Sequence, residues 1–271
     1  MYSIEILPDI IIDKIKSYVI FTPKENQELA NAVDLWCKEK KKAYKLYGHI
    51  SLWDTKHITK MDNLFTETAF NSVISSWNVK NVKSMTNMFS FAESFNQPLN
   101  NWDVSNVTDM SHIFGFAKLF NQPLDNWNVS KVKNMRCMFE DAKSFNQPLD
   151  KWNVSNVKDM GYMFAEAESF NQPLNKWNLS SIGNMQCMFA CAESFNQPLN
   201  SWNVGKVIYM AAMFSGAKSF NQPLNSWNVD KVKYMAAMFS GAKLFNQPLD
   251  NWDVNNVEDM QEMFKNAESF N

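Results

Sequence analysis

The chain of 271 residues is long enough for one or two ordinary domains, and apolar residues make up 45% of it, so it can bury a sizeable core. Its formal charge of −2 is close to neutral and gives no reason to expect a nucleic-acid partner or an anionic membrane surface. No apolar run reaches the roughly 18 residues that a membrane-spanning helix needs.

Residues 1–47 precede the repeats and are predicted to form a helical module of their own. Charged side chains such as Asp9, Asp13 and Lys16 interrupt the first twenty residues, and no basic start precedes them, which a secretory leader would not show. We expect amphipathic helices over residues 8–19 and about 24–46 that cap the first repeat. This reading predicts an intracellular, cytoplasmic protein, with a surface or virion location as the alternative.

Four cysteines occur, at positions 37, 137, 187 and 191. Cys137 and Cys187 fall at the same repeat position two repeats apart, where strand-like stacking places them about 9–10 Å from each other, too far for a disulfide. Cys187 and Cys191 have a spacing of four that could hold a metal, but no histidine lies near them in the sequence. We therefore expect core thiols, with no metal and no cofactor.

A strict internal repeat occupies the rest of the chain, residues 48–271. Tryptophan recurs every 25 residues, at 77, 102, 127, 152, 177, 202, 227 and 252, and Trp53 lies 24 residues before the first of these. The motif Phe-Asn-Gln-Pro-Leu recurs with the same period from Phe95. One 25-residue unit cannot bury its apolar face alone, so we expect about nine stacked coils whose core forms between neighbours.

Each coil is predicted to contain one short strand and one short helix. We place the strand around Gln97–Asn101, with its proline at an edge because proline cannot donate to a ladder. Val107, Met110 and Phe114 follow at spacings typical of a helix. The methionine, phenylalanine and tryptophan columns are predicted to fill the core. The asparagine column that begins at Asn96 is predicted to form a hydrogen-bonded ladder.

The repeat resembles a known family. The string Trp-Asp-Val-Ser-Asn-Val-Thr-Asp-Met at 102–110, followed by Met-Phe, Ala and Phe-Asn-Gln-Pro-Leu in the other copies, is similar to the BspA-like leucine-rich repeats. The resemblance implies an α/β repeat fold: a leucine-rich-repeat-like right-handed solenoid of 25-residue coils, each with a short parallel strand and a short helix, behind an α-helical amino-terminal cap. Bacterial members are secreted or lipid-anchored, and this chain shows neither signal.

The amino-terminal segment 7–19, with the sequence Leu-Pro-Asp-Ile-Ile-Ile-Asp-Lys-Ile-Lys-Ser-Tyr-Val, resembles the opening of an F-box. This resemblance implies that Leu7, Pro8, Ile11 and Ile15 contact a Skp1-like adaptor. The following stretch, 21–27, is more polar than in that family. The alternative is that the segment only caps the first coil, as repeat arrays require.

Two sets of surface positions could bind a partner. Four columns vary from coil to coil and are occupied by Thr108, Asp109, Ser111 and His112 in one coil; either surface drift or a binding stripe explains them, and we expect His112 to be exposed. In leucine-rich-repeat proteins the strand face commonly binds, which points to a polar set on that side: Asn100, Asn101, Asp125, Asn126, Asp150, Lys151, Asn175 and Lys176.

No phosphate-binding loop, nucleophile elbow or catalytic triad pattern occurs in the sequence. We therefore predict a non-enzymatic protein–protein interaction scaffold, with a substrate-recruiting F-box-type adaptor of a ubiquitin ligase as its specific form. The alternative is a structural or surface protein, virion-associated or of adhesion type, whose repeats give a rigid extended surface. The sequence stops at the start of another motif, so we also expect self-association through an uncapped last coil.

Overall fold

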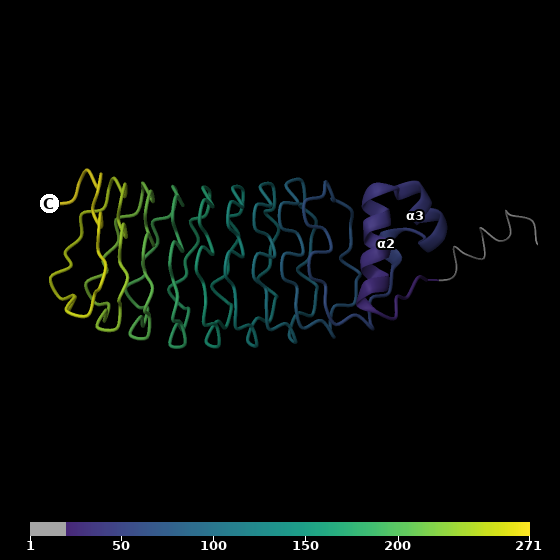
Figure 1. Ribbon diagram of the computed structural model, residues 1–271, viewed down its shortest axis with the longest axis horizontal. Coiled ribbons are helices and arrows are strands. Elements are labelled where there is room, and N and C mark those ends of the chain that lie inside the picture. Colours follow the sequence, from purple (N-terminus) through teal and green to yellow (C-terminus); the bar gives the residue numbers. More distant parts are fainter. Residues whose placement is uncertain (1–19) are drawn as a thin grey trace, which may run out of the picture.

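A computed structural model describes residues 20–271 as two helices followed by a long stack of coils (Figure 1). Helix α2 spans Asn26–Lys38, helix α3 spans Lys40–Tyr47, and a short 3-10 helix, η1, spans Ile50–Leu52. The helix predicted over 8–19 lies outside the described residues. Within 20–271, no helix has the length and apolar character that crossing a bilayer requires.

Helices α2 and α3 replace the single helix predicted over 24–46. Glu39, whose backbone is at φ −134° and ψ 59°, lies between them and interrupts the helical path. The buried side chains of α2 are Leu29, Ala32, Val33 and Trp36, a spacing that puts one apolar stripe on one face.

That apolar stripe packs against the start of the stack. Trp36 meets Trp53 of the first coil edge to face, with ring centroids 6.0 Å apart. The side-chain oxygen of Asn26 accepts hydrogen bonds from the backbone N–H groups of Thr59 and Lys60, at 3.0 and 3.2 Å. The helix pair therefore covers the first coil, as Figure 1 shows.

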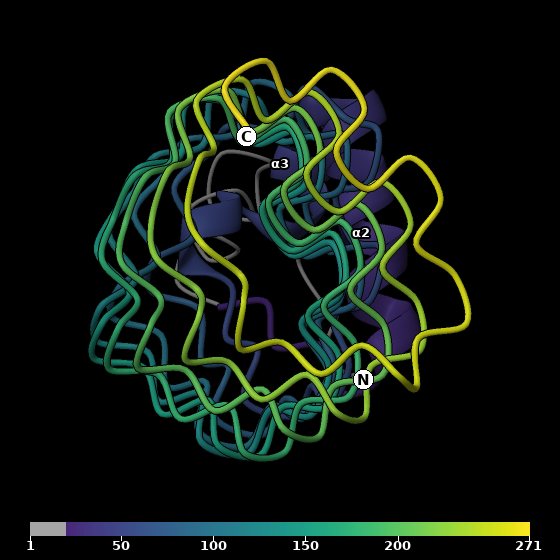
Figure 2. The same cartoon turned by 90° about the vertical axis from the view of Figure 1, so that its left-hand side faces the viewer.

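Backbone hydrogen bonds join each coil to the next. Near Asp109, for example, the N–H of Met110 donates to the carbonyl oxygen of Asn134 at 3.1 Å. Nine residues form a row of isolated parallel bridges along the stack: Lys60, Ser84, Asp109, Asn134, Asp159, Asn184, Tyr209, Tyr234 and Asp259. The first interval in this row is 24 residues and the later ones are 25, so equivalent residues lie side by side and the coils superimpose along the axis (Figure 2).

The helix predicted after Val107 is not formed, because the chain makes consecutive turns there. The N–H of Ile113 donates to Met110 three residues back, at 3.3 Å, whereas the intervening N–H of His112 donates to the next coil. His112 and Phe116 have φ values of 54° and 60°, in the left-handed region that an α-helix cannot contain. Successive turns thus produce the apolar spacing that suggested a helix.

The strand predicted around Gln97–Asn101 is not formed either, because side chains make the contacts between coils in this segment. The side-chain oxygen of Asn96 accepts hydrogen bonds from the backbone N–H of Asn121 and from the side-chain amide of Gln122, both at 3.0 Å. The same pair of bonds recurs along the column in later coils. This confirms the predicted asparagine ladder, although its members are half-buried and not fully internal.

The tryptophan column lies inside the stack, as predicted. Trp53 to Trp227 are at most 3% exposed. Each indole N–H donates to a backbone carbonyl oxygen earlier in the chain; Trp53 donates to Tyr47 of α3, and Trp152, for example, donates to Leu124 of the stack, both at 3.0 Å. The carbonyl oxygen of Leu124 also accepts the backbone N–H of Trp127, so one oxygen binds two successive tryptophans. A buried N–H thereby keeps a partner in every coil.

Methionine and phenylalanine columns fill the rest of the core. Six methionines of the predicted column are fully buried: Met110, Met135, Met160, Met185, Met210 and Met235. The phenylalanine rings stack along the axis, with 5.7 Å between the centroids of Phe139 and Phe164. Met260 was predicted to be buried but is 42% exposed, because the last coil packs against a neighbour on one side only.

Candidate functional site

The polar row is the set of eight residues predicted to bind a partner on the strand side: Asn100, Asn101, Asp125, Asn126, Asp150, Lys151, Asn175 and Lys176. It is half-buried to exposed along the stack, on turns and not on strands. Its side chains bond to one another across coils: the amide of Asn100 donates to Asp125 at 3.0 Å, and the N–H of Asn126 donates to Asn100 at 3.0 Å.

Ion pairs continue the polar row. Lys151 contacts Asp125 at 2.8 Å and Lys176 contacts Asp150 at 2.7 Å. The hydrogen bond from Lys151 holds the pKa of Asp125 below its ordinary value and raises the pKa of Lys151 itself. Because the lysines are largely exposed to solvent, such pairs contribute little to the stability of the fold. Many polar groups of the row are therefore already satisfied within the chain.

The variable face consists of the four variable columns, which are those of Thr108, Asp109, Ser111 and His112. It lies on the turn segments that carry the row of parallel bridges. On it, Ile208, Tyr209 and Tyr234 expose apolar or aromatic surface, and Tyr209 is 44% exposed. The rings of Tyr209 and Tyr234 stack in parallel, with centroids 5.2 Å apart. Beside them is a shallow groove of about 590 Å³, lined by Lys206, Ile208, Asp230, Lys231, Lys233, Asn256 and Glu258.

Two expectations for side chains in the left-handed turns were wrong. His112 was expected to be exposed but is half-buried against the next coil, and this burial lowers its pKa. Cys191 was expected in the core but is exposed, whereas Cys137 is buried. All four thiols are free, as predicted, and burial raises the pKa of Cys187.

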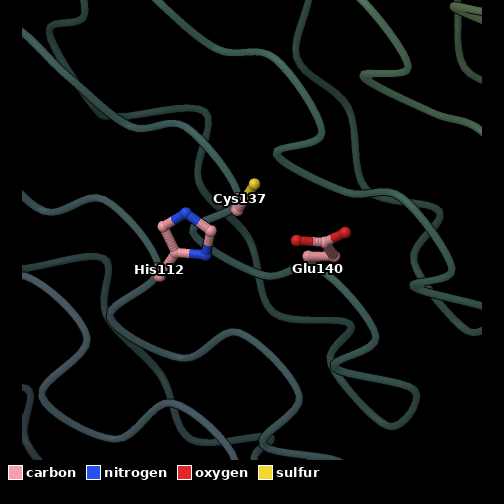
Figure 3. Close-up of side chains that lie close together, drawn as sticks. All are labelled: His112, Cys137 and Glu140. Carbon is pink, nitrogen blue, oxygen red and sulfur yellow. The ribbon is translucent and has the colours of Figure 1, made fainter.

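A cluster of possible metal ligands was missed by the sequence analysis. His112 and Cys137 occupy the same column in neighbouring coils, and Glu140 follows Cys137 by three residues; one donor atom from each lies within 4.8 Å of the others (Figure 3). The signal in the sequence was the exact interval of one repeat between the histidine and the cysteine. The expectation of a metal pair extended only to Cys187 and Cys191 within one coil, and so it did not include this pair across coils.

The four residues predicted to contact an adaptor, Leu7, Pro8, Ile11 and Ile15, lie outside the described residues. The polar row and the variable face described above therefore include none of these four residues.

Comparison with known proteins gives one family. A family model described as "Mycoplasma protein of unknown function, DUF285" matches residues 37–143, 124–217 and 173–271. The three overlapping matches cover the whole repeat array. No curated protein matches the chain.

Proposed function

The chain belongs to this Mycoplasma/BspA-like repeat family, and we propose that it is a non-enzymatic scaffold that binds another protein through its variable face. In this proposal the chain is a solenoid of the leucine-rich-repeat type, in which the repeated columns build the core and the variable columns select the partner. The aromatic pair Tyr209–Tyr234 is the centre of the binding surface.

The stacked tyrosine pair, in which Tyr209 is exposed and Tyr234 half-buried, is the observation that carries the proposal. At the same column, other coils carry Asp109, Asn134 or Asp159, whose side-chain oxygens accept the backbone N–H two residues later, at 2.8 to 3.1 Å. The two tyrosines cannot make that bond; Tyr209 is exposed instead and Tyr234 is half-buried beside it. A coil that lacks this local hydrogen bond and carries an aromatic ring at its surface is better explained by partner binding than by the stability of the fold.

The surroundings of the tyrosine pair favour a protein partner. Tyrosine is enriched at the energetic centres of protein interfaces, with charged groups at the rim. Here the exposed Ile208 adds apolar area, and the pair of Lys233 and Glu258, 2.6 Å apart, borders the groove. The polar row is the weaker candidate, because its side chains already bond to one another.

A matched pair of variants tests this face. Tyr209→Asn with Tyr234→Asn puts into the two coils the residue that Asn134 and Asn184 supply elsewhere, so the fold should be kept. Lys151→Ala with Lys176→Ala changes the polar row instead. Each chain is used as cross-linking bait in the cells that encode it.

The proposal expects a partner that the asparagine variant loses and the alanine variant keeps. Loss with the alanine variant alone would move the site to the polar row. If no specific protein is captured by any of the chains, the scaffold proposal fails.

The specific form of the proposal is an adaptor that recruits a substrate to a ubiquitin ligase. Its support is the resemblance of residues 7–19 to an F-box and the order along the chain, in which α2 and α3 come after that segment and before the coils. Co-purification with a Skp1-like protein, abolished by Leu7→Ala with Pro8→Ala, is the expected result. Unchanged capture by the double variant would leave those residues without an adaptor role.

The second candidate is a structural or surface protein, and the uniform core favours it. Identical contacts in successive coils give a stiff rod whose length scales with the number of repeats. Association of the protein with particles or cell envelopes, unaffected by the Tyr209 and Tyr234 variants, would support this role over the scaffold. The four free thiols are the reason to keep an intracellular location in the main proposal.

A further inference from the structure

We propose that His112, Cys137 and Glu140 form a binding site for one transition-metal ion, with Zn²⁺ as the best fit. The site joins two neighbouring coils, one carrying His112 and the other Cys137 and Glu140 (Figure 3). The tyrosine pair of the variable face belongs to later coils.

The repeat geometry brings the three side chains together. His112 and Cys137 are one repeat apart and share the left-handed turn position, with φ values of 54° and 55°. Their backbones are fixed by hydrogen bonds to the following coils, from His112 to Arg136 and from Cys137 to Gly161, both at 2.9 Å. The two ligands are therefore held at fixed spacing by backbone, not by flexible loops.

The donor atoms lie close enough for coordination after small side-chain rotations. All three are within 4.8 Å of one another, and tetrahedral zinc bonded at its usual lengths needs separations of about 3.3–3.7 Å. The cysteine is buried, whereas His112 and Glu140 are half-buried, so an ion can enter from their side. Three protein ligands leave the fourth position to water.

The mixture of donors selects the kind of ion. One imidazole nitrogen, one sulfur and one carboxylate oxygen match the ligands that Zn²⁺ takes in proteins, whereas Ca²⁺ and Mg²⁺ require sets of oxygen ligands. A thiolate and a carboxylate together also neutralise the charge of a divalent cation. Binding would release the thiol proton of Cys137 to solvent.

The neighbouring charges leave room for the ion. Arg136 lies over the ring of Tyr162, 4.7 Å from its centroid, and so extends toward the coil on the other side of Cys137 from His112. Asp109 does not compete for the histidine, because its carboxylate bonds to Ser111 at 2.7 Å and to Asn134 at 3.3 Å.

The chain contains its own control for this site. Cys187 occupies the same column two coils later, also in a left-handed turn, with φ 54°. There Tyr162 stands where the first site has His112, and Ala190 stands where it has Glu140. The second thiol therefore shares the backbone geometry and lacks both other ligands.

Conservative variants are available from the other repeats. Alanine already occupies the His112 and Cys137 column at Ala212 and Ala237, and it occupies the Glu140 column at Ala165 and Ala190. His112→Ala, Cys137→Ala, Glu140→Ala and the control Cys187→Ala should therefore fold like the parent. Circular dichroism and thermal melting check this before any binding experiment.

The experiment titrates Zn²⁺ into the reduced full-length chain by calorimetry and repeats the titration with Co²⁺ by absorption. We expect one ion per chain and a thiolate-to-cobalt charge-transfer band. Each of the three ligand variants should weaken binding at least tenfold, and Cys137→Ala should remove the band. Cys187→Ala should change neither property.

Three results would overturn the assignment. Binding of zinc by the His112→Ala, Cys137→Ala and Glu140→Ala chains as tight as by the parent would place the ion elsewhere, and no zinc binding by the folded parent would mean that the cluster holds no metal. A cobalt band that is lost in Cys187→Ala but kept in Cys137→Ala would assign the thiolate to the other turn.

Discussion

Replacing Ala212 by glycine should stabilise the protein, whereas the same replacement at its neighbour Ala211 should destabilise it. Both alanines are half-buried on the turn segment of the same coil. Ala212 has φ 53°, in the left-handed region, and Ala211 is not among the residues with positive φ. The two variants thus differ in backbone conformation and in little else.

The magnitudes follow from two opposing terms. A side chain in the left-handed region costs about 1–2 kcal/mol, which glycine at position 212 would recover. Glycine also adds freedom to the unfolded chain, which costs roughly 0.5–1 kcal/mol at either position. We therefore expect Ala212→Gly to add about 0.5–1 kcal/mol to the free energy of unfolding and Ala211→Gly to remove a similar amount.

Urea unfolding followed by circular dichroism measures both changes, provided that the slope of the transition is the same in all variants. Ala236 and Ala237 repeat the pair one coil later, with φ 54° at Ala237, and provide an independent replicate. Equal destabilisation by glycine at 211 and 212 would show that the turn is not left-handed there, and the turn-based account of the coils would fail.

Three further predictions address the core, the ladder and a buried charge. Met160→Ala should lower the free energy of unfolding by about 2–5 kcal/mol, while the same change at the half-exposed Met260 should cost much less; chemical denaturation compares them. Asn146→Ala should cost about 1–3 kcal/mol, because two donors of the next coil lose their acceptor, and Asn146→Asp should restore most of this in the same assay. Burial raises the pKa of Asp141, and one of its oxygens has no hydrogen-bond partner, with Lys143 at 3.7 Å. The folded protein thus binds the proton more tightly than the unfolded chain, so stability falls as the pH rises through the pKa of Asp141. Asp141→Asn should therefore stabilise the protein at neutral pH, and the gain should vanish in acid; thermal melts across pH that show a constant gain would contradict this.

The burial pattern was predictable because a repeat can satisfy its apolar side chains only with its own copies. Trp152 and Met160 are buried by their equivalents above and below, as the period alone required. The asparagine ladder was predictable for the same reason, since an amide that recurs in register meets its own neighbours. Periodicity therefore predicts contacts between coils well.

The path of the chain within one coil was not predictable from the same pattern. Apolar residues spaced by three and four indicate a helix in isolation, yet consecutive turns bury the same positions. The deciding signal would have been glycine in the left-handed columns. Only Gly216 and Gly241 supply it, both at φ 68°, whereas other coils place His112, Phe116 or Cys137 in that conformation.

The candidate sites depend on distances between coils. For this reason one of them was predicted from the sequence and the other was missed. The stacked pair of Tyr209 and Tyr234 lies in a column that was recognised as variable. The His112–Cys137–Glu140 cluster required a comparison between coils, because neighbouring residues in space are 25 apart in the sequence. A histidine with no other metal ligand near it along the chain can thus have a thiol beside it in space.

The carbonyl oxygen that binds two successive tryptophans has a consequence for how such a gene can change its length. Because the donor and acceptor are the same in every coil, removing or adding one complete unit would rejoin surfaces that already fit. The identical sequence of residues 210–217 and 235–242 is what such an event leaves behind. Recombination between units can therefore lengthen or shorten the array while each junction stays intact, provided that it proceeds in whole multiples of the period.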